Sequence, residues 1–149
     1  MEKDMLIVET QMLVRKPVQE VFNAFIDPAI TTNFWFTKSS GKLEAGKQIV
    51  WEWEMYNAKA DVSVVSIETD KKIMVLWGQP ATTIEFNFEA TSERTTYVTI
   101  KNYGFHQTGD ELIKTIIDVT GGFTTVLDGL KAYLEQGIRL NLIGDKFKK

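Results

Sequence analysis

The residues with the clearest chemical capacity in this chain are one histidine and several paired carboxylates. His106 is the only histidine, and histidine is the side chain best suited to acid–base catalysis near neutral pH. Without a second histidine or any cysteine, a metal centre would need almost entirely carboxylate ligands. No serine lies in a nucleophile-elbow pattern. We therefore predict no catalytic residue, no metal site and no cofactor, and interpret His106 as a loop or polar-lining residue.

The carboxylate pairs are Glu52 with Glu54 and Glu85 with Glu89. Each pair alternates with aromatic or aliphatic residues along an extended segment, so its members share the face opposite the apolar side chains. We interpret these faces as solvated rather than catalytic.

Two adjacent glycines, Gly121 and Gly122, resemble a phosphate-binding loop only superficially. The sequence contains neither GxxxxGK nor GxGxxG around them. We predict instead that they permit a bend between the segment 112–119 and a last helix beginning near Thr120, which would serve as its cap.

Large aromatic side chains form the third candidate group, because the alternation places them on inward faces. A filled core is one interpretation, since each ring buries a large apolar area. The other is an internal cavity, because many rigid rings on a curved sheet are hard to pack without voids. Thr96 and Asn102 are the inward polar groups. The predicted ligand-binding residues are Trp35, Trp51, Trp53, Trp77, Phe86, Phe88, Phe123 and Leu127.

Strands and two short helices must position these residues. Apolar spacing predicts a helix over 18–26, and Asp27 followed by Pro28 predicts a cap and a second short helix towards Asn33. Alternation and turn residues predict about seven strands. They cover 5–14, a short piece around Lys42, 48–56, 61–67, 73–77, 82–89 and 97–102.

The segment 120–137 carries one apolar stripe, with Phe123, Leu127, Leu130 and Leu134 at helical spacing. We expect this stripe to face the sheet and Lys131 to lie on the solvent side. A single long helix after an antiparallel meander suits the role of covering the sheet.

Three stretches carry a resemblance to a known family: VRKPVQEVFNAFIDP (14–28), GKLEAGKQIVWEWE (41–54) and GGFTTVLDGLKAYLEQGIRLNLIGDKF (121–147). In order and spacing the chain resembles the SRPBCC superfamily of START-like and pollen-allergen-like helix-grip proteins. Within it, the chain is most similar to the branch of activator of heat-shock protein 90 ATPase homologues. That family commonly has tryptophan after the glycine that starts the last helix. Phe123 keeps a ring there but lacks the N–H donor.

The resemblance implies one α+β domain over 1–149, with a curved antiparallel sheet wrapped around a long C-terminal helix. It also implies an apolar small molecule or lipid-like ligand between sheet and helix. A polyketide cyclase or hydrolase-like enzyme and a co-chaperone that binds a protein remain alternatives. For the co-chaperone alternative we expect little or no stimulation of a chaperone ATPase, because the full-length eukaryotic activators carry an additional N-terminal domain.

Composition excludes several classes of partner and site. The net charge of -3 supplies no basic surface for nucleic acid. Absence of cysteine rules out disulfides and is compatible with a bacterial cytoplasm, where we expect the protein. No apolar run is long enough for a membrane span or a signal peptide. The protein is expected to be a monomer or a homodimer.

Overall fold

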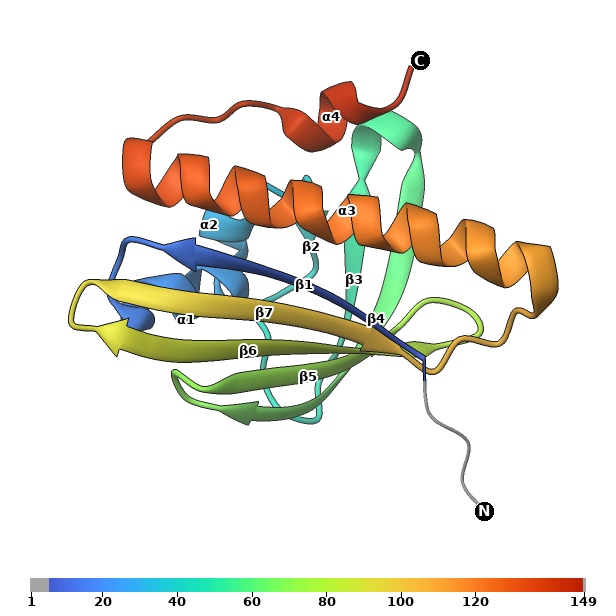
Figure 1. Cartoon of the computed structure of the whole chain (residues 1–149), viewed down its shortest axis with the longest axis horizontal. Coiled ribbons are helices and arrows are strands. Elements are labelled where there is room, and N and C mark those ends of the chain that lie inside the picture. The colour runs from blue at the N-terminus through green and yellow to red at the C-terminus, as the bar shows by residue number, and fades with distance from the viewer. Residues whose placement is uncertain (1–5, 149) are drawn as a thin grey trace.

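A seven-stranded antiparallel sheet, curved beneath one long helix, forms the frame of the protein (Figure 1). The computed structural model describes residues 6–148, so the predicted start of the first strand at Met5 lies outside them. The strands lie in the order β1-β7-β6-β5-β4-β3-β2. They are β1 (Ile7–Val14), β2 (Lys38–Ser39), β3 (Gln48–Trp53), β4 (Ala58–Glu68), β5 (Lys72–Trp77), β6 (Thr82–Ser92) and β7 (Thr95–Tyr103).

The helices are α1 (Val18–Ile26), α2 (Pro28–Thr31), the 3-10 turn η1 (Glu54–Tyr56), α3 (Gly109–Gln136) and α4 (Leu142–Lys146). Helices α1 and α2 lie at one end of the sheet, and α3 crosses above it (Figure 1). The predicted α+β helix-grip architecture is confirmed. The predicted cap is also present, because the Asp27 carboxylate accepts from the Ala29 N–H at 3.0 Å.

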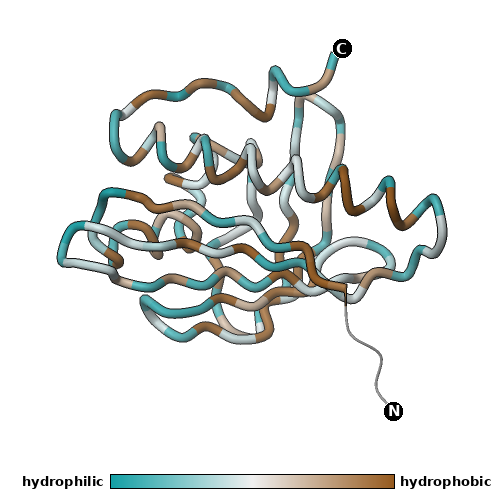
Figure 2. Tube along the Cα trace, viewed as in Figure 1, coloured by the Kyte–Doolittle hydropathy of each residue, from teal (hydrophilic) through white to brown (hydrophobic). Residues whose placement is uncertain are grey.

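The register of the strands explains which side chains face inward. On β7 the residues Thr96, Val98, Ile100 and Asn102 are all buried, while the residues between them are more exposed. The same two-residue period continues on the paired strands β1 and β6. Figure 2 shows hydrophobic and polar residues alternating along these strands. One face of the sheet is therefore the core.

The second strand lies slightly earlier than predicted. Lys42 belongs to no strand, and the short edge strand β2 is Lys38–Ser39, paired with Trp51 and Glu52 of β3. Two residues give too little alternation to recognise this strand in the sequence.

The last helix is much longer than predicted. It begins at Gly109 rather than near Thr120, so Gly121 and Gly122 lie inside a continuous helix and the predicted bend is wrong. Thr120 is not a cap; its carbonyl oxygen accepts a hydrogen bond from the Thr124 hydroxyl at 2.8 Å. Each glycine costs a helix about 1 kcal/mol relative to alanine, which neighbouring turns and packing can offset. Ile113 and Ile117 remain exposed on the N-terminal half, where Figure 2 shows a hydrophobic group.

The C-terminal half of α3 packs on the sheet as its stripe predicts. Phe123, Leu127 and Leu130 are buried, and Leu134 is half-buried beside them. Gly129 is also buried. The helix lies so close to the segment after α2 that a Cβ on Gly129 would be 3.2 Å from the Phe34 Cβ. A side chain at Gly129 would push the helix away from the chain segment that follows α2.

Lys131 does not lie on the solvent side, contrary to the prediction. Its ammonium group donates to the Leu13 carbonyl oxygen at 2.7 Å and to the Glu135 carboxylate at 2.6 Å. Glu135 also accepts from the Arg15 N–H at 2.7 Å. This cluster ties the end of α3 to the end of β1 across more than one hundred residues of sequence.

We predict that Leu130→Ala lowers the free energy of unfolding by about 2–5 kcal/mol, because it removes a fully buried side chain and leaves a cavity. Asp128→Ala, on the exposed face of the same turn, is the control and should change stability by less than about 0.5 kcal/mol. Urea denaturation of both variants measures the difference. Equal losses would show that the stripe does not form the main contact with the sheet.

A second prediction concerns the Lys131–Glu135 cluster. Burial alone would raise the pKa of Glu135, but hydrogen bonds from Lys131 and the Arg15 N–H and the charges of both residues outweigh it, and the pKa falls below 4.5. The ionised carboxylate therefore stabilises the fold fully above about pH 4.5, and this contribution disappears as the pH drops through the lowered pKa.

Accordingly, Glu135→Gln should be less stable than the parent at pH 7, and the gap should narrow below pH 4.5. Thermal unfolding across this pH range measures it, with Glu93→Gln in the exposed β6–β7 turn as the control. If the difference in stability between the parent and Glu135→Gln stays constant with pH, the stability lost in the variant comes from packing rather than from charge.

Candidate ligand-binding groove

A groove of about 210 Å³ lies between the middle of α3, the ends of β3 and β5, and α4. We call it the tryptophan groove. Strands β3 and β5 contribute Trp53 and Trp77, and α3 contributes Phe123 with its aliphatic neighbours. The remaining lining residues are Trp35, Tyr56, Asp118, Val119, Gly122, Val126, Ile143, Lys146 and Phe147.

The aromatic wall of the groove is held by edge-to-face and tilted ring contacts. The Trp77 and Phe123 centroids are 5.7 Å apart, and Trp53 meets Trp77 at 6.2 Å and 64°. Trp35 lies behind them, 6.1 Å from Trp77. Such contacts add about 0.5–1.5 kcal/mol per pair beyond area burial. The wall is therefore formed before any ligand arrives.

Space in the groove depends on Gly122. This residue lines the groove from α3, and a Cβ built on it meets no atom within 4 Å. The glycine pair that the sequence analysis assigned to a bend therefore includes one residue that keeps the groove open.

Helix α4 closes the groove from the side away from the sheet, and Tyr56 holds it there. The Tyr56 hydroxyl donates to the Ile143 carbonyl oxygen at 2.5 Å and accepts from the Phe147 N–H at 3.3 Å. Its ring also meets the Phe147 ring edge-on at 5.8 Å. Asn141 starts the helix with a positive φ of 56°. We call residues 138–147 the C-terminal strap.

Charged groups are few in the tryptophan groove and lie at its rim. Asp118 and Lys146 are exposed, and no ion pair within 4.0 Å joins them in the described structure. The Tyr56 hydroxyl is already used by the strap. The lining can therefore select a ligand by apolar contact, with charge only at the opening.

The predicted ligand-binding residues separate into two groups. Trp35, Trp53, Trp77 and Phe123 line the tryptophan groove. Trp51, Phe86, Phe88 and Leu127 lie in the core: Trp51 stacks on Phe36 at 4.9 Å, and Phe88 meets Phe22 edge-on at 5.3 Å. Alternation places the strand residues of both groups on one face and does not distinguish the rings that border the groove from those in the centre.

The predicted inward polar residues lie away from the groove. Thr96 donates to the Lys16 carbonyl oxygen at 2.9 Å, and Asn102 donates to the Thr83 carbonyl oxygen at 2.7 Å, so both are structural. His106 is exposed in the loop after β7, where its Nε2 lies 3.1 Å from the Ala81 carbonyl oxygen. None of the three lines the tryptophan groove.

Sequence reasoning missed Gly122, Val119, Val126 and the whole C-terminal strap. Val126 belongs to the apolar stripe of α3 and could have been assigned from it. Ile143 and Phe147 are four residues apart, which is a helical spacing, but five residues of helix give no periodicity.

The Glu85 carboxylate on the outer face of the sheet is structural. Burial alone would raise the pKa of Glu85, but the Tyr103 hydroxyl donates to it and Lys72 lies 3.3 Å away, and together they lower the pKa. Burial and the same carboxylate raise the pKa of Tyr103 to about 12. Glu85 therefore stays charged, as a member of a cross-strand network.

Among residues 6–148, no group of three or more histidine, aspartate or glutamate side chains could hold a metal ion. None of the described helices is long and apolar enough to cross a membrane.

Comparison with known proteins identifies relatives. The sequence profile of the family described as Activator of Hsp90 ATPase homolog 1-like protein matches residues 15–135. No protein with a curated description matches the chain. A crystal structure of a protein from Staphylococcus saprophyticus is 32% identical with a TM-score of 0.80, over 91% of this chain and 96% of that one.

Two more distant structures share the fold. The Aha1 dimer from Colwellia psychrerythraea, solved in solution, is 18% identical with a TM-score of 0.75, over 89% of this chain and 98% of that one. DynU16, a putative protein in the dynemicin biosynthetic locus, is 20% identical with a TM-score of 0.80. That match spans 89% of this chain and 48% of the other.

We predict that Tyr56→Phe loosens the C-terminal strap without disturbing the sheet. The variant keeps the ring contact with Phe147 but loses the hydroxyl that bonds to Ile143 and Phe147. Losing about 1 kcal/mol of net hydrogen bonding should speed amide exchange in α4 by roughly fivefold. Hydrogen exchange followed by NMR measures this, with the amides of β6 and β7 as internal controls. Unchanged exchange in α4 would show that other contacts hold the strap.

Proposed function

Since the chain belongs to the Activator of Hsp90 ATPase homolog 1-like family, we propose that it binds an apolar small molecule or lipid-like ligand in the tryptophan groove. The observation that carries this proposal is the lining itself. Aromatic and aliphatic side chains from the sheet, α3 and α4 form the walls, while the charged residues Asp118 and Lys146 are confined to the rim. Transfer of the apolar surface of a ligand from water into such a site is favourable.

The volume of the groove limits the ligand. About 210 Å³ is below the roughly 300–1,000 Å³ of common small-molecule sites, so the part of the ligand held inside is compact. A fused aromatic ring or the end of an acyl chain fits this description. A longer ligand would extend through the open side of the groove into solvent.

Rigidity of the walls favours binding. Trp53, Trp77 and Phe123 are already fixed by contacts with each other and with Trp35. Little side-chain freedom is lost when a ligand arrives, so more of the apolar contact energy remains as affinity. The hydrogen bonds of Tyr56 likewise fix α4 in place over the groove.

Catalysis in this groove is not favoured by its polar groups. An acid–base mechanism needs a titrating side chain within hydrogen-bond reach of the bound substrate. His106 is outside the groove, and Asp118 and Lys146 line it only as exposed residues at its rim. The test below therefore distinguishes ligand binding from a cyclase or hydrolase activity and from a protein-binding co-chaperone activity.

The test uses a neutral aromatic probe, 2-naphthol, and a variant that fills the groove. Gly122→Leu places a side chain in open space on a helix, so it should fold at least as stably as the parent. We expect the parent to bind 2-naphthol with a Kd on the order of 10 µM, about -7 kcal/mol, and Gly122→Leu to bind at least about tenfold more weakly. Isothermal titration calorimetry measures both.

Gly122→Ala is the matched control. It gives a similar gain in helix propensity but adds only one methyl group, so binding should remain within about threefold of the parent. Equal affinity of the parent and Gly122→Leu for 2-naphthol would overturn the proposed site. Stimulation of a chaperone ATPase that Gly122→Leu leaves intact would support the co-chaperone alternative. A reaction abolished by His106→Ala would support the enzyme.

A further inference from the structure

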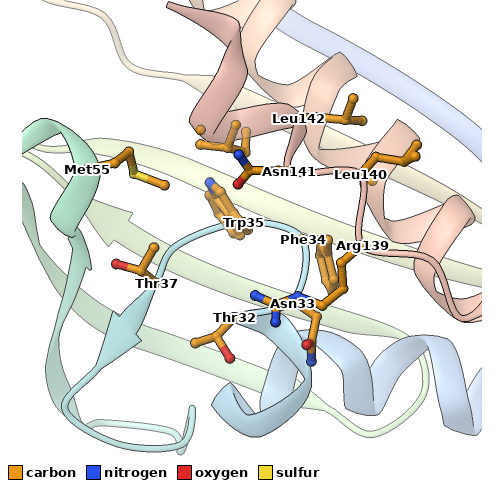
Figure 3. A pocket seen from close by; sticks show the side chains of 13 residues that line it. Thr32, Asn33, Phe34, Trp35, Thr37, Met55, Arg139, Leu140, Asn141 and Leu142 are labelled. Atoms are coloured by element: carbon orange, nitrogen blue, oxygen red, sulfur yellow. The ribbon is translucent and has the colours of Figure 1, made fainter. Parts of the chain in front are cut away.

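A second pocket, of about 350 Å³, shares Trp35 with the tryptophan groove, and Figure 3 shows its lining. One wall is the segment after α2, with Asn33, Phe34 and Trp35. The opposite wall is the linker from α3 to α4, with Arg139 and Leu140, and the first residue of α4, Leu142. Met55 of η1 and Gly129 of α3 complete the enclosure. We call this the Arg139 pocket.

The charge of the Arg139 pocket differs from that of the protein as a whole. The chain carries 20 acidic residues and a net charge of -3, yet no aspartate or glutamate lines this pocket. Arg139 is its one charged lining residue. Within residues 6–148, the guanidinium group of Arg139 forms no ion pair and no hydrogen bond. An anion entering the pocket therefore displaces no internal partner of Arg139.

The hydrogen-bond donors that remain available in the Arg139 pocket are few, because the side-chain NH2 groups of Asn33 and Asn141 already donate to carbonyl and carboxylate oxygens outside the lining. The Thr32 and Thr37 hydroxyls already donate to the carbonyl oxygens of Pro28 and Glu52. By contrast, the indole N–H of Trp35 has no acceptor in the described part of the chain. Figure 3 shows the ring nitrogen of Trp35 directed toward the side of the pocket where Asn141 lies. The guanidinium group of Arg139 and the indole N–H of Trp35 are therefore the donors on offer, and with Arg139 as the one cation they suit a ligand with a single negative charge.

Apolar surface makes up much of the rest of the lining. Met55, Leu140, Leu142 and Ile143 surround the rings of Phe34 and Trp35. A bare inorganic anion would leave this surface in contact with water. One guanidinium pairs well with the two oxygens of a carboxylate, whereas a phosphate commonly needs more than one positive group or a set of backbone N–H donors.

We propose that the Arg139 pocket binds a small organic carboxylate. The carboxylate pairs with the guanidinium group of Arg139, and its apolar body lies against Met55, Leu142 and Trp35. This site is separate from the tryptophan groove, because the two share only Trp35 and Ile143 and the charged residues of the two linings differ. The proposal does not depend on the function proposed for the groove.

The experiment compares 2-naphthoate with neutral 2-naphthol, which has the same ring system. Titration calorimetry with Arg139→Gln should show at least about a tenfold loss of 2-naphthoate affinity, while 2-naphthol binding stays within twofold. Gly122→Leu should show the opposite pattern, with at least about a tenfold loss of 2-naphthol affinity while 2-naphthoate binding stays within twofold. Because Arg139 is exposed and unpaired, its replacement should leave the fold intact. Arg94→Gln, which removes an equal charge in the exposed β6–β7 turn, is the matched control and should bind both probes as the parent does.

Two further measurements sharpen the result. The Arg139 Nε–H resonance should shift on addition of 2-naphthoate but not of 2-naphthol. Affinity for 2-naphthoate should also fall with added salt, because the pair is close to solvent. Unchanged 2-naphthoate affinity in Arg139→Gln, loss of that affinity in Gly122→Leu, or no binding to the parent would each overturn the proposal.

Discussion

Trp35 is the contact on which the rest of the interior depends. Its ring lies between 4.8 and 6.4 Å from the centroids of seven other rings, which come from α1, the segment after α2, β3, β5, β6 and α3. A single helix cannot cover the inward face of seven strands unaided, and this side chain fills the space between α3 and the far strands. Its placement follows from the Asp27 cap and the short helix α2, which turn the chain back into the core.

The same side chain lines two chemically different compartments, both of which are also lined by residues of the C-terminal strap. One has Trp53, Trp77 and Phe123, with only peripheral charge; the other has Arg139 and the available indole N–H. Ile143 of α4 borders both compartments. The position of α4 therefore affects the shape of each, and the bonds from Tyr56 that hold α4 are shared by the two.

Local patterns in the sequence were enough to predict the sheet but not enough to predict the residues that line the candidate site. Alternation identified the inward faces of β6 and β7, because one buried face imposes a strict two-residue period. The N-terminal half of α3 escaped recognition because Ile113 and Ile117 stay exposed and the glycine pair interrupts the stripe. The strap escaped because it is fixed by Tyr56, about ninety residues away in the chain. Trp51 and Trp53 show the same limit: they share a face, but only the curvature of the sheet places one in the core and the other at the groove.

The clustering of the tryptophans has an optical consequence. All four tryptophans of the chain belong to one group, with Trp35, Trp51, Trp53 and Trp77 linked by centroid distances of 4.8 to 6.3 Å. At such separations the indoles exchange excitation energy faster than they emit, and their transitions couple. The indole fluorescence of this protein therefore comes from one coupled group beside the two compartments. Although the chain has 149 residues, its tryptophan emission reports on a single place in its structure.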